Sequence, residues 1–126
     1  MLKKTMVMAA ASLGLIFATP ALASKASEMV TQMADYMQFM VGPQDGGEFT
    51  IVSIKAEGEV LVLRVDGPTG WRKEQTADQL SNRFLTGFCE QGASLFDDGM
   101  KIRIETTESG GSSLLIGPNA DQCPAV

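Results

Sequence analysis

The sequence contains no histidine. Histidine is the most frequent general acid and base in enzymes, a member of most serine and cysteine triads, and a common zinc ligand. Its absence therefore removes most hydrolytic and zinc-dependent mechanisms from consideration. P-loop, dinucleotide-binding and haem-attachment motifs are missing as well. We expect no catalytic residue, no metal site and no cofactor, and the enzymatic alternative that stays open is a small hydrolase with a carboxylate or serine centre.

Clusters of basic residues are also scarce. The chain has 10 Lys and Arg against 15 Asp and Glu, a formal net charge of −5 at pH 7, and beyond the N-terminus only Arg72 and Lys73 form an adjacent basic pair. Binding to nucleic acid or to anionic lipid heads requires a row of positive charges that neutralises phosphates. We therefore expect no nucleic-acid partner, and the acidic balance mainly favours solubility.

The acidic clusters lack the spacing of a catalytic or calcium site. Asp97 and Asp98 are adjacent and precede Gly99, whereas a glycosidase needs two carboxylates that face each other across the substrate. A calcium loop needs a D-x-D-x-D-G series and a distal glutamate, which the sequence does not contain. We interpret these residues, and likewise Asp45 and Glu48 around a pair of glycines, as solvated turns.

The N-terminal segment has the three regions of a secretory signal peptide. A charged start is followed by an apolar stretch up to Ala18, and residues 21–23 (Ala-Leu-Ala) resemble a cleavage site. The apolar stretch is shorter than the ~20 residues that span a bilayer, and Pro20 closes it. We expect a cleaved signal peptide over residues 1–23, no stable membrane anchor, a periplasmic or secreted location, and a single domain over residues 24–126.

The chain has two cysteines, Cys89 and Cys123. Thiols of exported proteins are oxidised, and an even count lets every thiol find a partner. We expect one disulfide between them, which would close a loop of about 35 residues, tether the C-terminal tail and stabilise the fold by about 3–4 kcal/mol. A reactive Cys89 is the alternative, but a nucleophilic thiolate needs a nearby base.

The sequence after the signal peptide begins with a helical pattern. Apolar residues recur every three or four positions, and Gly42-Pro43 ends the pattern. We expect this stripe to pack into the core. Because thioethers are soft and adaptable, a metal-binding or peptide-binding methionine surface is the alternative. The stripe consists of Ala26, Met29, Val30, Met33, Met37 and Met40.

Four segments have the composition of strands. β-branched and apolar residues over 48–56 and 59–66 predict two strands joined by a tight turn. The segment 59–66 is apolar on both faces near its start, which favours a central position in the sheet. Alternating apolar and polar residues over 100–107, followed by the apolar segment 112–117, predict a second hairpin.

A second helix is predicted between the two hairpins. Thr76 and Gln79 have the spacing of a capping box that begins a helix, and Gly92 is expected to end it. The order of elements is therefore helix, strand, strand, helix, strand, strand. We expect an α+β domain in which an antiparallel four-stranded sheet has two helices packed on one face.

This order of elements, with Cys89 at the end of the second helix and Cys123 near the C-terminus, resembles the pilotins that escort secretin subunits in bacterial type II secretion. The resemblance covers most of residues 24–126. It implies an α+β fold with a disulfide, and an apolar groove that holds a helix of a partner protein. Pilotins are typically lipoproteins, whereas here no cysteine follows the predicted cleavage site.

The segment GPTGWRKE is the candidate partner-binding site. It contains the only tryptophan, Trp71, beside Arg72 and Lys73. Trp and Arg are the residues most enriched where binding energy concentrates in protein interfaces. The alternative is that Trp71 folds back as a lid over the core, because large aromatic side chains are usually well buried.

Taken together, these observations predict a small exported non-catalytic protein of the bacterial cell envelope. We expect a binding or accessory role, chaperone-like or inhibitor-like, with an unknown protein partner in the envelope. The alternative is a small periplasmic hydrolase. A deep pocket with convergent polar groups would favour the hydrolase, whereas a shallow apolar groove would favour binding.

Overall fold

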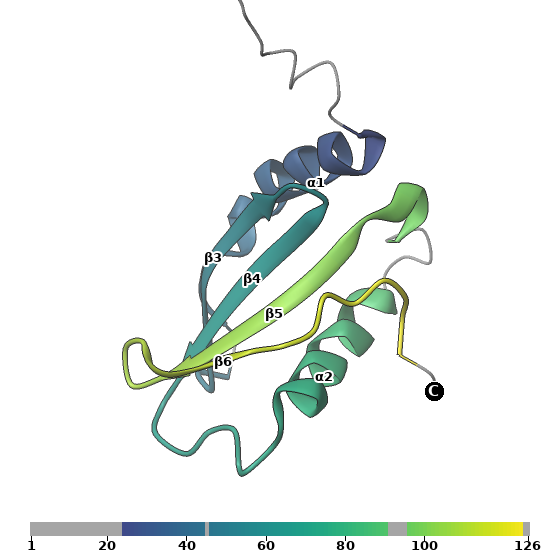
Figure 1. Ribbon diagram of the computed structural model, residues 1–126. Helices are drawn as coiled ribbons and strands as arrows, with labels where there is room; N and C mark the ends of the chain where they lie inside the picture. Colours follow the sequence, from purple (N-terminus) through teal and green to yellow (C-terminus); the bar gives the residue numbers. More distant parts are fainter. Residues whose placement is uncertain (1–23, 45, 91–95, 125–126) are drawn as a thin grey trace, which may run out of the picture.

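The computed structural model of the protein describes residues 24–44, 46–90 and 96–124 (Figure 1). The predicted signal peptide of residues 1–23 and the predicted helix end at Gly92 lie outside these ranges. None of the helices within them has the length and the apolar character that crossing a membrane requires.

Helix α1 (Lys25–Tyr36) begins where the sequence supplies a cap. The Ser24 hydroxyl accepts a hydrogen bond of 3.0 Å from the backbone N–H of Ser27, which satisfies one free donor of the first turn. The helix then tightens into the 3₁₀ turn η2 (Met37–Met40). One apolar stripe packs into the core, as predicted. Its buried members are Ala26, Val30, Ala34 and Met37, and Met33 and Met40 are partly buried.

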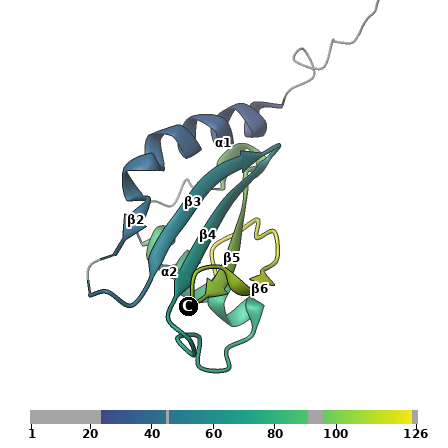
Figure 2. The same cartoon turned by 90° about the vertical axis from the view of Figure 1, so that its left-hand side faces the viewer.

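The strands form one mixed sheet in the order β2-β3-β4-β5-β6 (Figures 1 and 2). Neighbouring strands are antiparallel except β4 and β5, which are parallel. The prediction of four antiparallel strands was therefore wrong, because the sheet has five strands and one parallel pair. The strands are β2 (Gly42–Pro43), β3 (Thr50–Glu57), β4 (Val60–Gly67), β5 (Lys101–Glu108) and β6 (Ser112–Ile116).

The parallel pairing follows from the connection between β4 and β5. Helix α2 (Ala77–Cys89) lies in this connection, and a chain that returns through a helix on one face of the sheet can enter parallel to the strand it left. The helix begins at the predicted capping box. The Thr76 hydroxyl accepts from the Gln79 N–H at 3.1 Å, and the Gln79 side chain accepts from the Thr76 N–H at 2.8 Å.

Both helices cover the same face of the sheet. Val30 of α1 and Leu85 of α2 belong to one hydrophobic cluster with Leu63 of β4 and Ile104 of β5, which confirms that part of the predicted fold. Strand β4 is central, as its apolar pattern predicted. Val62, on its opposite face, is only 5% exposed, so β4 is buried on both sides.

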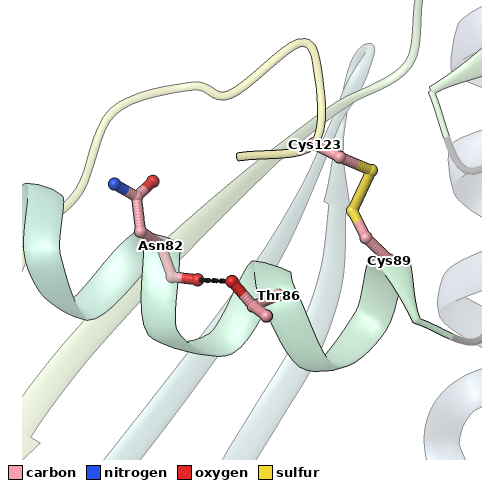
Figure 3. Close-up of a disulfide and its surroundings, with 4 residues drawn as sticks. All are labelled: Asn82, Thr86, Cys89 and Cys123. Atoms are coloured by element: carbon pink, nitrogen blue, oxygen red, sulfur yellow. Dashed lines mark hydrogen bonds between the residues drawn. A yellow bond between two sulfur atoms is a disulfide. The ribbon is translucent and has the colours of Figure 1, made fainter. Parts of the chain in front are cut away.

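The C-terminal tail is held against the body by the cysteine pair and by hydrogen bonds to β5. The sulfur atoms of Cys89 and Cys123 lie 2.04 Å apart and their Cα atoms 6.0 Å apart, a geometry compatible with the predicted disulfide (Figure 3). Between β6 and this link, Ala120 exchanges backbone hydrogen bonds of 2.8 and 2.9 Å with Ile102 of β5. The tail thus continues the line of β6 to the end of α2.

Candidate partner-binding surface

Trp71 and Arg72, which were predicted to contact a partner, are buried in the fold. Trp71 is 4% exposed and Arg72 is 6% exposed, whereas Lys73 is exposed. As folded, the Trp71 and Arg72 side chains therefore offer almost no surface to another protein. The burial of Trp71 agrees with the alternative interpretation, in which this residue closes one end of the core.

Trp71 is held by contacts with distant elements. Its Nε1–H donates a hydrogen bond of 2.8 Å to the carbonyl oxygen of Thr107 on β5. The ring stacks on Phe49 with centroids 6.1 Å apart and meets Phe84 of α2 edge-on at 6.2 Å, while the Arg83 guanidinium lies 5.8 Å from its centroid. Trp71 thereby joins the sheet, α2 and the segment before β3.

The guanidinium group of Arg72 forms hydrogen bonds with the last two strands, β5 and β6. Its Nη1 donates to the carbonyl and hydroxyl oxygens of Thr106 at 3.1 and 2.9 Å, and its Nη2 donates to the Ser113 carbonyl at 2.8 Å. The same guanidinium pairs with Glu108 at 2.9 Å. The pKa of Glu108 is lowered first by the Gly70 backbone N–H and then by Arg72. Arg72 therefore stabilises the β5–β6 hairpin.

An open groove with a mixed polar and apolar lining lies where η2 leads into β2. It has a volume of about 470 Å³. Beside it, the rings of Tyr36 and Phe39 are 75% and 74% exposed and meet edge-on with centroids 5.8 Å apart. We use the name aromatic groove for Tyr36 together with the lining residues, none of which carries a charge. The lining residues are Phe39, Met40, Val41, Pro43, Gln44 and Phe49.

Gln44 and Phe49 give the aromatic groove its shape. The Gln44 side-chain amide donates hydrogen bonds to the carbonyl oxygens of Met40 and Gly42 at 3.0 and 2.8 Å, and its backbone N–H donates to Phe49 at 3.1 Å. Gly42 has a φ of +133°, a conformation that glycine adopts at little cost. Since Phe49 also stacks on Trp71, the buried tryptophan positions one wall of the groove.

The hydrophobic pattern of the sequence did not predict this groove. Tyr36, the last residue of α1, and Phe39 of η2 are not among the residues of the predicted apolar stripe, and both are exposed. Two large aromatic residues on a polar helix face were the available signal. The pattern could not show that β2 and Phe49 come next to them, because these contacts depend on the fold.

The sheet face opposite the helices carries a network of ion pairs. Glu105, 5% exposed, accepts from Arg64 at 2.6 Å and from Arg103 at 2.9 Å, and Arg103 also pairs with Glu57 at 2.8 Å. Burial alone would raise the pKa of Glu105, but the hydrogen bonds from Arg64 and Arg103 outweigh this effect and lower the pKa. The charged side chains of this network therefore form ion pairs with one another.

The described residues give no support to the hydrolase alternative. The carboxyl groups with shifted pKa values, Asp66, Glu105 and Glu108, are all shifted downward, whereas a general acid needs a raised pKa. The buried Ser81 hydroxyl has no hydrogen-bonded base within this part of the chain. Nor do the residues that the structure describes contain a group of three or more His, Cys, Asp or Glu that could hold a metal ion.

The fold resembles that of the pilotins of bacterial type II secretion systems, which confirms the resemblance inferred from the order of elements and the two cysteines. The structure of the pilotin AspS from Vibrio cholerae matches with a TM-score of 0.56 and 17% sequence identity, over 82% of this chain and 93% of that one. The pilotin EpsS from Vibrio vulnificus matches with a TM-score of 0.56 and 15% identity, over 72% of this chain and 87% of that one.

At these identities the likeness concerns the fold alone. A comparison with models of protein families found no match. A comparison with curated protein sequences found no match either.

Proposed function

We propose that the protein is a non-catalytic accessory protein of the bacterial cell envelope that binds a partner protein through the aromatic groove. The observation that carries the proposal is an uncharged groove with two exposed aromatic side chains, Tyr36 and Phe39, on a pilotin-like fold. Contiguous exposed apolar patches on soluble proteins commonly mark interaction sites. Aromatic residues contribute large contact areas at a low cost in conformational entropy.

The ligand that suits this groove is an amphipathic helix of the partner. A helix presents apolar side chains every three or four residues along one face, and an apolar groove accepts such a row. The resemblance to pilotins, which escort secretin subunits, implies a groove that holds a helix of a partner protein. It therefore favours the same kind of ligand. The uncharged lining implies that affinity depends on apolar burial more than on ion pairs, and therefore varies little with salt.

The envelope location rests on the predicted signal peptide of residues 1–23 together with the cysteine pair. A disulfide between Cys89 and Cys123 suits an oxidising compartment such as the periplasm.

Capture of partners from periplasmic extract, followed by mass spectrometry, tests the proposal. The wild-type protein should retain a defined envelope protein, and a peptide from one of its helices should compete. Phe39→Ala should weaken binding of that peptide by about 30-fold, which corresponds to about 2 kcal/mol for an interface hot spot. Val52→Ala is the matched control, because Val52 is also exposed, at 47%, but lies on β3 outside the groove.

The thermal stability of both variants should stay close to that of the wild type, since neither side chain is buried. Equal binding by Phe39→Ala and the wild type would exclude the aromatic groove as the binding site. Turnover of ester or glycoside substrates by the purified protein would contradict the non-catalytic assignment.

A further inference from the structure

Strand β6 forms an exposed apolar edge of the sheet. It is the last strand in the sheet order, at the opposite end from β2. Three consecutive apolar side chains stand in solvent there, with Leu114 45%, Leu115 36% and Ile116 57% exposed. The segment from Ser112 to Gly117 contains no charged residue, on a protein with a net charge of −5. Natural edge strands are usually protected by charges, by proline, by a β-bulge or by a covering element. Strand β6 has no charge and no proline, and its register shift against β5 lies between the pairs Glu108–Ser112 and Thr106–Leu115, before Leu115 and Ile116.

The register determines which backbone groups of β6 point outward. Thr106 of β5 lies opposite Leu115, and the Gly117 N–H donates 2.9 Å to the Ile104 carbonyl. In an antiparallel pair the residues that exchange hydrogen bonds alternate with those that do not. The N–H and C=O groups of Leu115 therefore face β5. Those of Leu114 and Ile116 face away from the sheet.

The other edge of the sheet is closed, in contrast. Strand β2 pairs with the beginning of β3, at Thr50 and Ile51. Further along β3, the Gln38 side chain donates a hydrogen bond of 2.8 Å to the outward carbonyl of Ile54. An approaching strand would meet these elements before it reached the β3 backbone. The open edge is therefore specific to β6.

We propose that β6 pairs antiparallel with β6 of a second copy of the chain, about a two-fold axis at Leu115. In this register Leu114 lies opposite Ile116 of the second copy, and Ile116 lies opposite Leu114 of the second copy. Each of these two pairs exchanges both backbone hydrogen bonds, which gives about four in total. The two Leu115 side chains face each other across the axis and bury apolar surface.

A second copy suits this edge better than an unrelated peptide for two reasons. The outward groups are self-complementary about Leu115, because one residue on each side presents both a donor and an acceptor. Two copies of an acidic protein also repel each other over most of their surfaces, and β6 is a charge-free segment where that repulsion is least. Isologous contacts of this kind are the usual basis of dimers.

The helices do not obstruct the pairing. Helix α2 packs mainly on β5, and its first turns, at Ala77 and Ser81, also lie close to Gly117 at the end of β6. In the dimer the two β5 strands are separated by three strand spacings, about 14 Å. Packed helices need about 8–10 Å between their axes, so the two copies of α2 fit side by side on the same face. The aromatic grooves lie at the far ends of the joint sheet and stay accessible.

Sedimentation velocity over a range of concentrations tests whether this dimer forms. The wild-type protein should show a reversible monomer–dimer equilibrium. Leu115→Glu places two carboxylates opposite each other and should raise the dimer dissociation constant by more than about tenfold. Val52→Glu adds the same charge at an exposed position on β3 and should leave the dissociation constant unchanged.

Cysteine cross-linking tests the register. Leu115→Cys brings two thiols together at a non-hydrogen-bonded pair, where Cα atoms are about 4.5 Å apart, and should give a covalent dimer under mild oxidation. In Leu114→Cys, each cysteine lies opposite residue 116 of the second copy, two residues away from the second cysteine. This variant should therefore cross-link much less. A wild-type protein that is monomeric at all concentrations, or a dimer that Leu115→Glu and Val52→Glu weaken equally, overturns the proposal. So does equal cross-linking of the two cysteine variants.

Discussion

The indole ring of Trp71 lies directly against the Cα atom of Gly67, at the end of β4. A Cβ atom at position 67 would come within 2.6 Å of Cγ of the ring and within 2.7 Å of Cδ1. Only glycine leaves room for the ring there, although the backbone of Gly67 does not need an unusual φ. The position of the Trp71 ring therefore depends on the absence of a side chain at position 67. Because Phe49 stacks on Trp71, the wall of the aromatic groove that Phe49 forms depends on it as well.

Gly67→Ala should destabilise the protein. The added methyl group overlaps the ring, and relief of such an overlap displaces packed groups at a cost of about 1–3 kcal/mol. Urea unfolding followed by tryptophan fluorescence measures the difference. Gly87→Ala is the control, because nothing lies within 4 Å of a Cβ atom at that position of α2, and alanine favours the helix by about 0.5–1 kcal/mol. Loss of stability in both variants to the same extent would contradict the overlap.

Trp71→Ala should lower the free energy of unfolding by about 3–5 kcal/mol, as expected for removal of a buried large aromatic side chain. The melting temperature should fall by more than about 10 °C in a domain of this size. Lys73→Ala, an exposed neighbour, should change the stability by less than about 0.5 kcal/mol. An unchanged melting temperature for Trp71→Ala would show that the ring does not support the core.

The double variant Cys89→Ser, Cys123→Ser should be less stable than the oxidised wild type by about 3–4 kcal/mol, because the link closes a long loop in the unfolded chain. Differential scanning calorimetry with and without reductant measures this. Alkylation of the purified protein before reduction should label neither cysteine. Labelling of both would mean that the thiols are free and that the tail is held without a covalent link, by contacts such as the hydrogen bonds of Ala120 with Ile102 and of Asn119 with Arg103.

Stability should decrease on acidification through Glu105. Its pKa in the folded protein lies below the ordinary value of 4.5, so its contribution is fully present above that value and is lost as the pH falls through the folded pKa. Glu105→Gln should cost about 2 kcal/mol at neutral pH, where the three charge-assisted hydrogen bonds that Arg64 and Arg103 donate to the carboxylate are weakened. The difference in the free energy of unfolding between this variant and the wild type should narrow as the pH falls below 4.5 and through the lowered pKa of Glu105. Melting curves over this range decide the point, and a constant gap would exclude the carboxylate as the cause.

Ser81→Ala should raise the free energy of unfolding by about 1 kcal/mol. The hydroxyl is buried, 1% exposed, and makes no hydrogen bond within the described part of the chain, so its removal relieves a desolvation cost. Ser112→Ala is the matched control. Its hydroxyl donates 2.7 Å to the Glu108 carbonyl, and its loss should leave the stability unchanged or slightly lower. A destabilised Ser81→Ala would show that the hydroxyl has a partner in solution.

Features that depend on neighbours in the chain were predictable from the sequence. The capping box of Thr76 and Gln79 located the start of α2, and the apolar residues on both faces of the segment 59–66 placed β4 at the centre of the sheet. The apolar stripe of α1 was also recognised, except that Ala34 was not assigned to it. In each case a few adjacent residues carry the information, because caps and periodicity act over one or two turns.

Features that depend on distant contacts were not predictable in the same way. The direction of β5 is set by the path of α2 across the sheet, and a strand–helix–strand order was the only local hint of a parallel pair. The sequence left open whether Trp71 contacts a partner or covers the core, and it did not reveal the hydrogen-bond acceptors of Trp71 and Arg72, which are Thr107 and Thr106, on the far side of α2 in the sequence. No periodicity links these positions, so burial of the pair emerges only in the folded chain.

The parallel pairing of β4 and β5 also sets an order of events for a chain that emerges N-terminus first. The hairpin of β3 and β4 can close early, but β4 then exposes apolar groups on both faces and a free edge until the whole of α2 and β5 has followed. A partly synthesised or partly exported chain is therefore prone to aggregation, since its hydrophobic surface is exposed to solvent. Maturation must wait for the last quarter of the polypeptide, which makes a holding chaperone useful during biogenesis.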